Sequence, residues 1–223
     1  EGPVDTNVLK GGEADGVFHP GVVDSSGNGN DLSTWSEGGC CGYVYRSDIA
    51  ASTVPLTGAP NSLSVQNTGG FPALWTASAA MQTVEPAAFT IEASFKPENG
   101  AYRTIVGRDS QGATPDTDGN LAALYFQMVP DDGVAIKFAD VSGFWHEAIS
   151  EAGAIQGFPW PETQLGKWYH MAAVSDGSTL SLYLHDVDAG GGYQLVAQTD
   201  LTLSGSPNTA LTKGAGDGGD WDA

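Results

Sequence analysis

The sequence predicts an all-β protein, an antiparallel sandwich of two stacked sheets with long loops in its N-terminal part. Short runs rich in β-branched and aromatic residues recur from about residue 60 onward, and no convincing helical pattern competes with them. The 31 Gly and 12 Pro residues are spread between these runs, which is typical of strands closed by turns. A chain of 223 residues suits one large sandwich, so we expect a single domain over residues 1–223.

The strands are predicted from alternation and from the turns between them. In the run FTIEASF the apolar residues from Phe89 to Phe95 share one face and Glu92 lies on the other, as in a half-buried strand. Asp176-Gly177 and the segment Pro130–Gly133 predict hairpins. The expected strands are Phe89–Pro97, Arg103–Arg108, Leu121–Val129, Val134–Ala139, Trp145–Ser150, Trp168–Val174, Leu180–His185 and Tyr193–Thr199.

The segment from Glu1 to about Ala59 is rich in Gly, Asp and Asn, and we expect it to be mostly loop pinned by a few short strands. A second irregular insertion is expected at Phe158–Glu162. Loops on a rigid scaffold often carry function, so both segments are candidate regions for a site.

The charge balance excludes some partners. With 27 acidic and 8 basic side chains the formal net charge is −19, which repels nucleic acid and anionic lipid and attracts cations. No apolar run approaches the ~20 residues of a membrane span. The first residues, Glu1 to Asp5, do not form a signal peptide, so we expect the sequence to be a mature product.

Two stretches carry a family resemblance. Residues 165–186 read LGKWYHMAAVSDGSTLSLYLHD, and residues 23–32 read VDSSGNGNDL. With the strands from Phe89 to Thr199, they resemble the laminin G-like and pentraxin-like jelly rolls of the concanavalin A-like lectin/glucanase superfamily. The resemblance implies a jelly-roll sandwich, a secreted, extracellular protein, and carbohydrate or polysaccharide as partner.

The C-terminus departs from that family. Such domains usually finish with a strand similar to Gly-Tyr/Phe-Ile-Asp-Glu-Val, whereas this sequence ends Asp220-Trp221-Asp222-Ala223. We therefore expect the sandwich to lack its last strand or strands. Either the tail has been lost or cleaved, or another segment or a second chain completes the sheet, because an uncovered edge invites aggregation.

Cys40 and Cys41 are the only cysteines of the chain. They predict either a vicinal disulfide, which is strained because adjacent Cα atoms are only ~3.8 Å apart, or two free thiols or an intermolecular bridge. Fungal arabinofuranosidases with a sandwich catalytic domain are similar in having a Cys-Cys pair near the sugar, although the rest of their catalytic pattern does not match.

Sugar binding relies on aromatic faces and planar hydrogen-bonding groups. Trp75 and Trp168 are expected in the core. The predicted substrate-binding residues are Trp35, Cys40, Cys41, Tyr43, Tyr45, Arg103, Arg108, Tyr125, Gln127, Trp145 and Trp160.

A structural calcium ion is a further expectation. Asp24, Asn28, Asn30 and Asp31 offer the closely spaced oxygen ligands that calcium requires. The alternative is that these side chains form turns by hydrogen-bonding their own backbone.

The sequence has no diagnostic catalytic motif, but it contains residue types that two kinds of carbohydrate chemistry use. Glycoside hydrolysis needs two carboxylates, and a lyase needs a Tyr or His base with a cation near the uronate. The candidate catalytic residues are Glu147, His146 and Glu92. For a lyase, the available bases are Tyr125 and His146, and the available cations are Arg103, Arg108 and Lys137. The leading hypothesis is a lectin-like, calcium-braced carbohydrate-binding sandwich. The alternatives are a glycoside hydrolase or polysaccharide lyase, or a structural adhesion or assembly module.

Overall fold

The computed structural model describes residues 22–35, 43–53, 58–67, 73–76, 78–98, 100, 102–109, 122–156, 166–213 and 221–222. The chain divides into two compact units. One comprises Glu1–Met81 with Asp220–Ala223, and the other comprises Gln82–Gly219.

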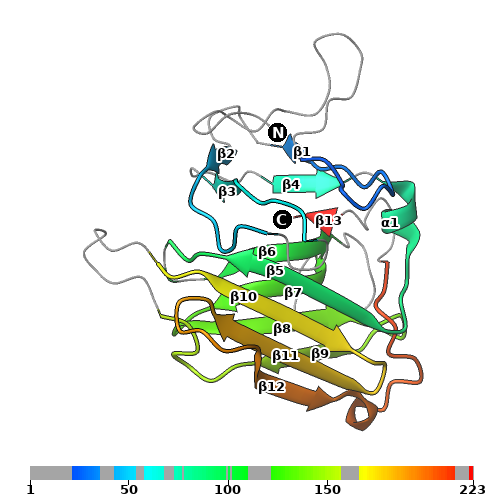
Figure 1. Cartoon of the computed structure of the whole chain (residues 1–223). Coiled ribbons are helices and arrows are strands. Elements are labelled where there is room, and N and C mark those ends of the chain that lie inside the picture. Colours follow the sequence, from blue (N-terminus) through cyan, green and yellow to red (C-terminus); the bar gives the residue numbers. More distant parts are fainter. Residues whose placement is uncertain are drawn as a thin grey trace. The chain divides into compact units, whose positions relative to one another are not determined.

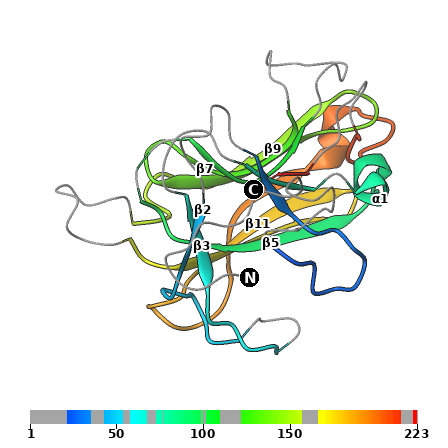
Figure 2. The same cartoon turned by 90° about the horizontal axis from the view of Figure 1, so that it is seen from above.

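The larger unit is an antiparallel sandwich of two sheets, as predicted (Figures 1 and 2). One sheet contains, in spatial order, β6 (Arg103–Asp109), β7 (Ala122–Val129), β8 (Gly133–Ala139) and β9 (Trp145–Ile149). The other contains β12 (Gln194–Asp200), β11 (Thr179–Asp186), β10 (Tyr169–Ser175) and β5 (Phe89–Phe95). Each of the eight expected strands is confirmed, with bounds that differ from the prediction by no more than two residues.

Apolar side chains from both sheets meet in the core of this unit. Phe126 of β7, Phe138 of β8 and Leu182 of β11 are fully buried. The ring of Phe89 in β5 packs edge-on against Phe138, with centroids 5.3 Å apart. Burying such side chains contributes about 1.5–3 kcal/mol each, so the alternation seen in the sequence drives the two sheets together.

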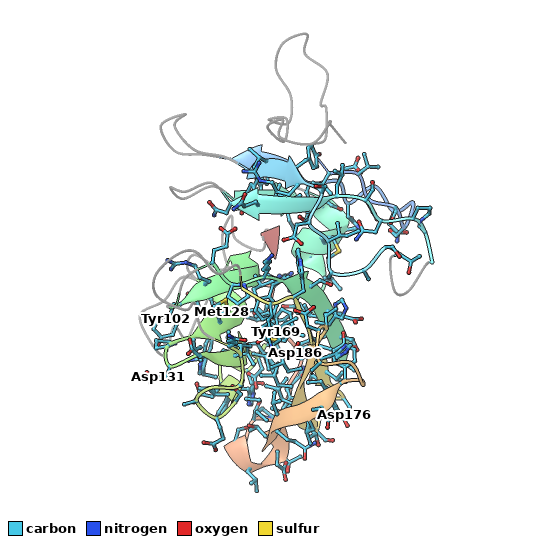
Figure 3. All side chains as sticks on the ribbon, turned by 60° about the vertical axis from the view of Figure 1, so that its left-hand side comes forward. Tyr102, Met128, Asp131, Tyr169, Asp176 and Asp186 are labelled. Atoms are coloured by element: carbon cyan, nitrogen blue, oxygen red, sulfur yellow. The ribbon has the colours of Figure 1, made fainter. Side chains whose placement is uncertain are left out.

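The two predicted hairpin turns have the geometry that short turns require. Asp131 and Asp132 adopt φ of 61° and 59° between β7 and β8, and Gly177 adopts φ of 87° between β10 and β11. Asp176 stabilises the second turn because its carboxylate accepts a hydrogen bond from the backbone N–H of Ser178 at 2.8 Å. Figure 3 labels Asp131 and Asp176.

The smaller unit has short strands and a small core of its own. Strands β1 (Ser33–Trp35), β4 (Ala73–Thr76) and β13 (Trp221–Asp222) pair in that order, and β2 (Tyr43–Arg46) pairs with β3 (Ser64–Asn67). Trp221 of β13 pairs with Thr76 of β4, so residues 221–222 contribute a short strand to this unit.

Two short helical segments were not predicted from the sequence. They are α1 (Ala79–Thr83) and the 3₁₀ helix η2 (Leu201–Ser204). No helix among the described residues has the length and apolar character needed to cross a membrane.

Candidate functional site

The outer face of the β6–β9 sheet brings together several predicted site residues. Because side chains alternate along a strand, Tyr125 and Gln127 of β7 lie on the face opposite to the buried Leu124 and Phe126. Tyr125 is paired with Lys137 of β8. We name this surface the aromatic face, and it comprises Tyr125, Gln127, Lys137, Trp145 and Glu147. Gln127 is only 6% exposed, so the predicted substrate contact at this residue is covered in the structure.

Two aromatic rings and an ion pair define the geometry of the aromatic face. The rings of Tyr125 and Trp145 have centroids 6.2 Å apart and are inclined by 69°, and both residues are half-buried. Lys137 Nζ lies 3.5 Å from Glu147 Oε2, and the side chain of Glu147 is 49% exposed. This face therefore offers apolar ring surface beside a charged donor and a charged acceptor.

The predicted catalytic residue His146 lies on the opposite face from Glu147. It is 3% exposed, and its Nε2 donates a hydrogen bond to Asp140 Oδ2 at 2.7 Å. Burial raises the pKa of Asp140, but hydrogen bonds from Ser206, His146 and the backbone of Phe144 outweigh it and leave that pKa below its usual range. The period of two along β9 separates neighbours in sequence, so His146 belongs to the core and Glu147 to the surface.

Arg108 and Arg103, both predicted to bind substrate, have different environments. Arg108 is fully buried and donates hydrogen bonds to the carbonyl oxygens of Gln82, Val84 and Thr212. That placement corrects the expectation of a substrate contact and favours a structural role. Arg103 is exposed at the start of β6 and donates to the carbonyl oxygen of Tyr102 at 2.7 Å.

Tyr43 and Tyr45 were expected in an exposed, ligand-binding loop. Instead they are 8% and 2% exposed and form a core with Leu74 in the smaller unit. Both point to the same side of β2 because its burial alternates. This placement favours packing over ligand contact.

The structure does not describe the side chains of some predicted site residues. Cys40, Cys41 and Trp160 lie outside the described residues, and for Trp35 the structure describes the backbone of β1 alone. The two tryptophans expected in the core, Trp75 and Trp168, are half-buried.

The outer face of the second sheet carries a cluster that sequence reasoning largely missed. We name it the histidine face, and it comprises Ser94, His170 and His185 with Glu92 and Tyr193 beside them. Of these only Glu92 was predicted as a site residue. Glu92 is exposed and accepts a hydrogen bond from the hydroxyl of Tyr193. Burial and this hydrogen bond raise the pKa of Tyr193.

The imidazoles of His170 and His185 are adjacent, with ring centroids 5.5 Å apart. Burial and the neighbouring His185 lower the pKa of His170, and Glu92 opposes that shift. Alternation in the sequence is enough to place each histidine on one face of its strand, but it does not give the register that makes the two histidines neighbours.

The loop from Asp24 to Asp31 forms the turns that were the alternative to calcium binding. Asp24 accepts hydrogen bonds from the backbone N–H groups of Ser26 at 2.8 Å and Asn30 at 2.9 Å, and Asp31 accepts one from Asp24 at 2.7 Å. The hydrogen bonds from Ser26 and Asn30 lower the pKa of Asp24. Asn28 donates to the Ser26 hydroxyl.

The same loop retains oxygen atoms that fit a hard cation. Asn30 Oδ1 is buried and has no hydrogen-bond partner, and each carboxylate oxygen can accept more than one interaction. Within the described part of the chain, however, no group of three or more His, Cys, Asp or Glu side chains is arranged to hold a metal ion.

Comparison with known proteins places the fold in a family. A family model described as the concanavalin A-like lectin/glucanases superfamily matches residues 72–223. No curated protein matches the chain. Since the matched region is more than half of the sequence and contains every strand of the two-sheet sandwich, the chain belongs to the concanavalin A-like lectin/glucanases superfamily.

Proposed function

We propose that this is a secreted, extracellular protein whose aromatic face binds a carbohydrate. Membership of a superfamily of lectins and glucanases supports a carbohydrate-binding or hydrolase-type sandwich. The observation that carries the proposal is the pair of half-buried rings, Tyr125 and Trp145, on the face of the sheet opposite to its core, next to the exposed Glu147.

The chemistry of the aromatic face suits a sugar. The C–H groups of a pyranose ring pack on aromatic faces, and its hydroxyls need donors and acceptors in fixed positions. Lys137 of β8, paired with Tyr125, supplies a donor, and Glu147 of β9, paired with Lys137, supplies an acceptor. The strongly acidic composition fits a secreted protein, because a large net negative charge keeps a protein soluble.

The binding proposal predicts which substitutions weaken a glycan complex. Once a glycan array identifies a ligand, Trp145→Ala and Tyr125→Ala are each expected to raise its Kd by about tenfold, through loss of aromatic packing. Calorimetry of each variant measures this. Tyr102→Ala is the control, because it removes an exposed aromatic ring (59% exposed) that is not one of the two rings proposed to bind sugar. Tyr102 precedes Arg103, which pairs with Met128 near the C-terminal end of β7. Equal affinities in all variants would contradict the proposal.

Glu147 favours one alternative, in which the aromatic face also cleaves its ligand as a glycoside hydrolase or polysaccharide lyase. A carboxylate beside two rings could transfer a proton, and Lys137 could neutralise a uronate. Reducing-end release by wild type that disappears in Glu147→Gln, with binding retained, would establish an enzyme. Binding without release would establish a lectin-like module. If wild type neither binds a glycan nor releases reducing ends, the structural adhesion or assembly role is the remaining alternative.

We also propose that calcium braces the loop of Asp24, Asn28, Asn30 and Asp31, as the donor set and the orphaned Asn30 Oδ1 suggest. A bound ion stabilises the folded state by mass action. Chelator is therefore expected to lower the melting temperature of wild type, and added calcium to restore it, whereas Asp31→Asn should respond less. A wild-type melting curve that does not move with chelator would exclude a stabilising ion.

A further inference from the structure

The histidine face has a feature that the carbohydrate proposal does not use. His170 and His185 are direct partners in the antiparallel pairing of β10 with β11. Their rings are 5.5 Å apart, centroid to centroid, and inclined by 42°. Both residues are half-buried. Two imidazoles held side by side by one sheet register form a rigid pair, since the backbone of both strands is fixed by hydrogen bonds.

No hydrogen bond among the described residues engages either Nε2 atom of this pair. Ser94 Oγ lies 2.6 Å from His170 Nδ1, which engages that nitrogen and leaves Nε2 as the other ring position. His185 Nε2 is buried and has no hydrogen-bond partner among the described residues. An unsatisfied buried polar atom costs about 1–3 kcal/mol, so a ligand at His185 Nε2 would remove a penalty already present in the fold.

The spacing of the rings matches two imidazoles on one ion. A zinc–nitrogen bond of about 2.0–2.1 Å, plus about 1.2 Å from nitrogen to ring centre, places each centroid about 3.2 Å from the metal. At a tetrahedral angle the two centroids are then about 5.2 Å apart. The observed 5.5 Å differs by a few tenths of an ångström, which a small opening of that angle accommodates.

We propose that the histidine face binds a borderline divalent transition-metal ion, such as zinc or copper, through the Nε2 atoms of His170 and His185. Imidazole suits these ions, and water completes the coordination because no group of three potential protein ligands is arranged for metal among the described residues. Ser94 is a positioning residue here, because a partner on the second ring nitrogen fixes the ring orientation of a metal-bound histidine. Glu92 supplies a nearby negative charge and is itself held by Tyr193.

Titration of the full chain with zinc sulfate and with copper sulfate tests the proposal by calorimetry. Wild type is expected to show a site that His170→Ala, His185→Ala and the double variant each weaken by at least about tenfold. Ser94→Ala should weaken it by about tenfold while retaining both ligands. A double variant that binds as tightly as wild type would overturn the proposal and assign the metal to the acidic surface.

A spectroscopic readout on wild type separates coordination from any effect of substitution on folding. In nitrogen-15 spectra of the histidine rings, zinc is expected to shift the Nε2 resonances of His170 and His185. His146 is the internal control, since its Nε2 is already bonded to Asp140 in the core. Unmoved resonances of His170 and His185 at saturating zinc would also overturn the proposal. Neither measurement involves a glycan, so either result is independent of the carbohydrate proposal.

Discussion

Replacing Asp140 with alanine is expected to lower the free energy of unfolding by about 3–5 kcal/mol. Asp140 is 1% exposed, and its Oδ1 accepts hydrogen bonds from the backbone N–H groups of Ser142 and Phe144, both at 2.9 Å. Its Oδ2 accepts from His146 Nε2 at 2.7 Å. Alanine leaves these three donors, and the Ser206 side chain that also hydrogen-bonds to Asp140, without that partner. Urea denaturation of both proteins measures the cost.

The stabilisation by Asp140 depends on pH in a definite direction. The folded-state pKa of Asp140 lies below its usual value, so the unfolded state binds a proton more readily. Its contribution is complete above about pH 4, near the pKa of an unfolded aspartate, and is lost as pH falls through the folded-state pKa. The difference in stability between wild type and Asp140→Ala should therefore shrink below about pH 4.

Asp176→Ala is the matched control. Asp176 also accepts backbone hydrogen bonds in a turn, from Ser178 at 2.8 Å and Thr179 at 2.7 Å, but it is exposed. Loss of an exposed capping interaction costs about 1 kcal/mol. If Asp140→Ala and Asp176→Ala proved equally destabilising, burial and the contact with His146 would not be the source of the effect.

Replacing Arg108 with methionine is expected to cost about 2–4 kcal/mol of unfolding free energy. Its guanidinium donates to the carbonyl oxygens of Val84 at 2.7 Å, Gln82 at 2.9 Å and Thr212 at 3.1 Å. These acceptors lie in the segments that enter and leave the sandwich, so one side chain joins both. Burial lowers the pKa of Arg108 to about 10, which still leaves it protonated at neutral pH.

Arg103→Met on the same strand is the control for Arg108→Met. Arg103 is exposed and bonds to the carbonyl of its neighbour Tyr102, so its replacement should change stability by less than about 0.5 kcal/mol. Thermal unfolding of both variants gives the comparison. A cost at Arg108 as small as at Arg103 would mean that other donors or water serve the freed carbonyl groups.

Local sequence by itself determined the strands and turns of the sandwich. The alternation that placed Glu92 opposite Phe89 and Phe95 is observed in β5, and Asp176-Gly177 forms the hairpin it predicted. These features depend on the period of a strand and on the φ preferences of a few residues, which act over short distances. Burial also alternates in β9, where Glu147 is exposed and His146 is buried, so these two catalytic candidates lie on opposite faces.

Tertiary structure alone decided which side chains meet. Arg108 and Arg103 belong to one predicted strand, and both were predicted to bind substrate. In the structure Arg108 is buried and hydrogen-bonded to a backbone carbonyl oxygen, and only its tertiary packing gives it this structural role. His170 meets His185 through the register of β10 with β11. Glu92 meets Tyr193 across 101 residues of sequence. Register and sheet packing depend on the whole apolar pattern of both strands and on what covers them, so no local pattern encodes these neighbours.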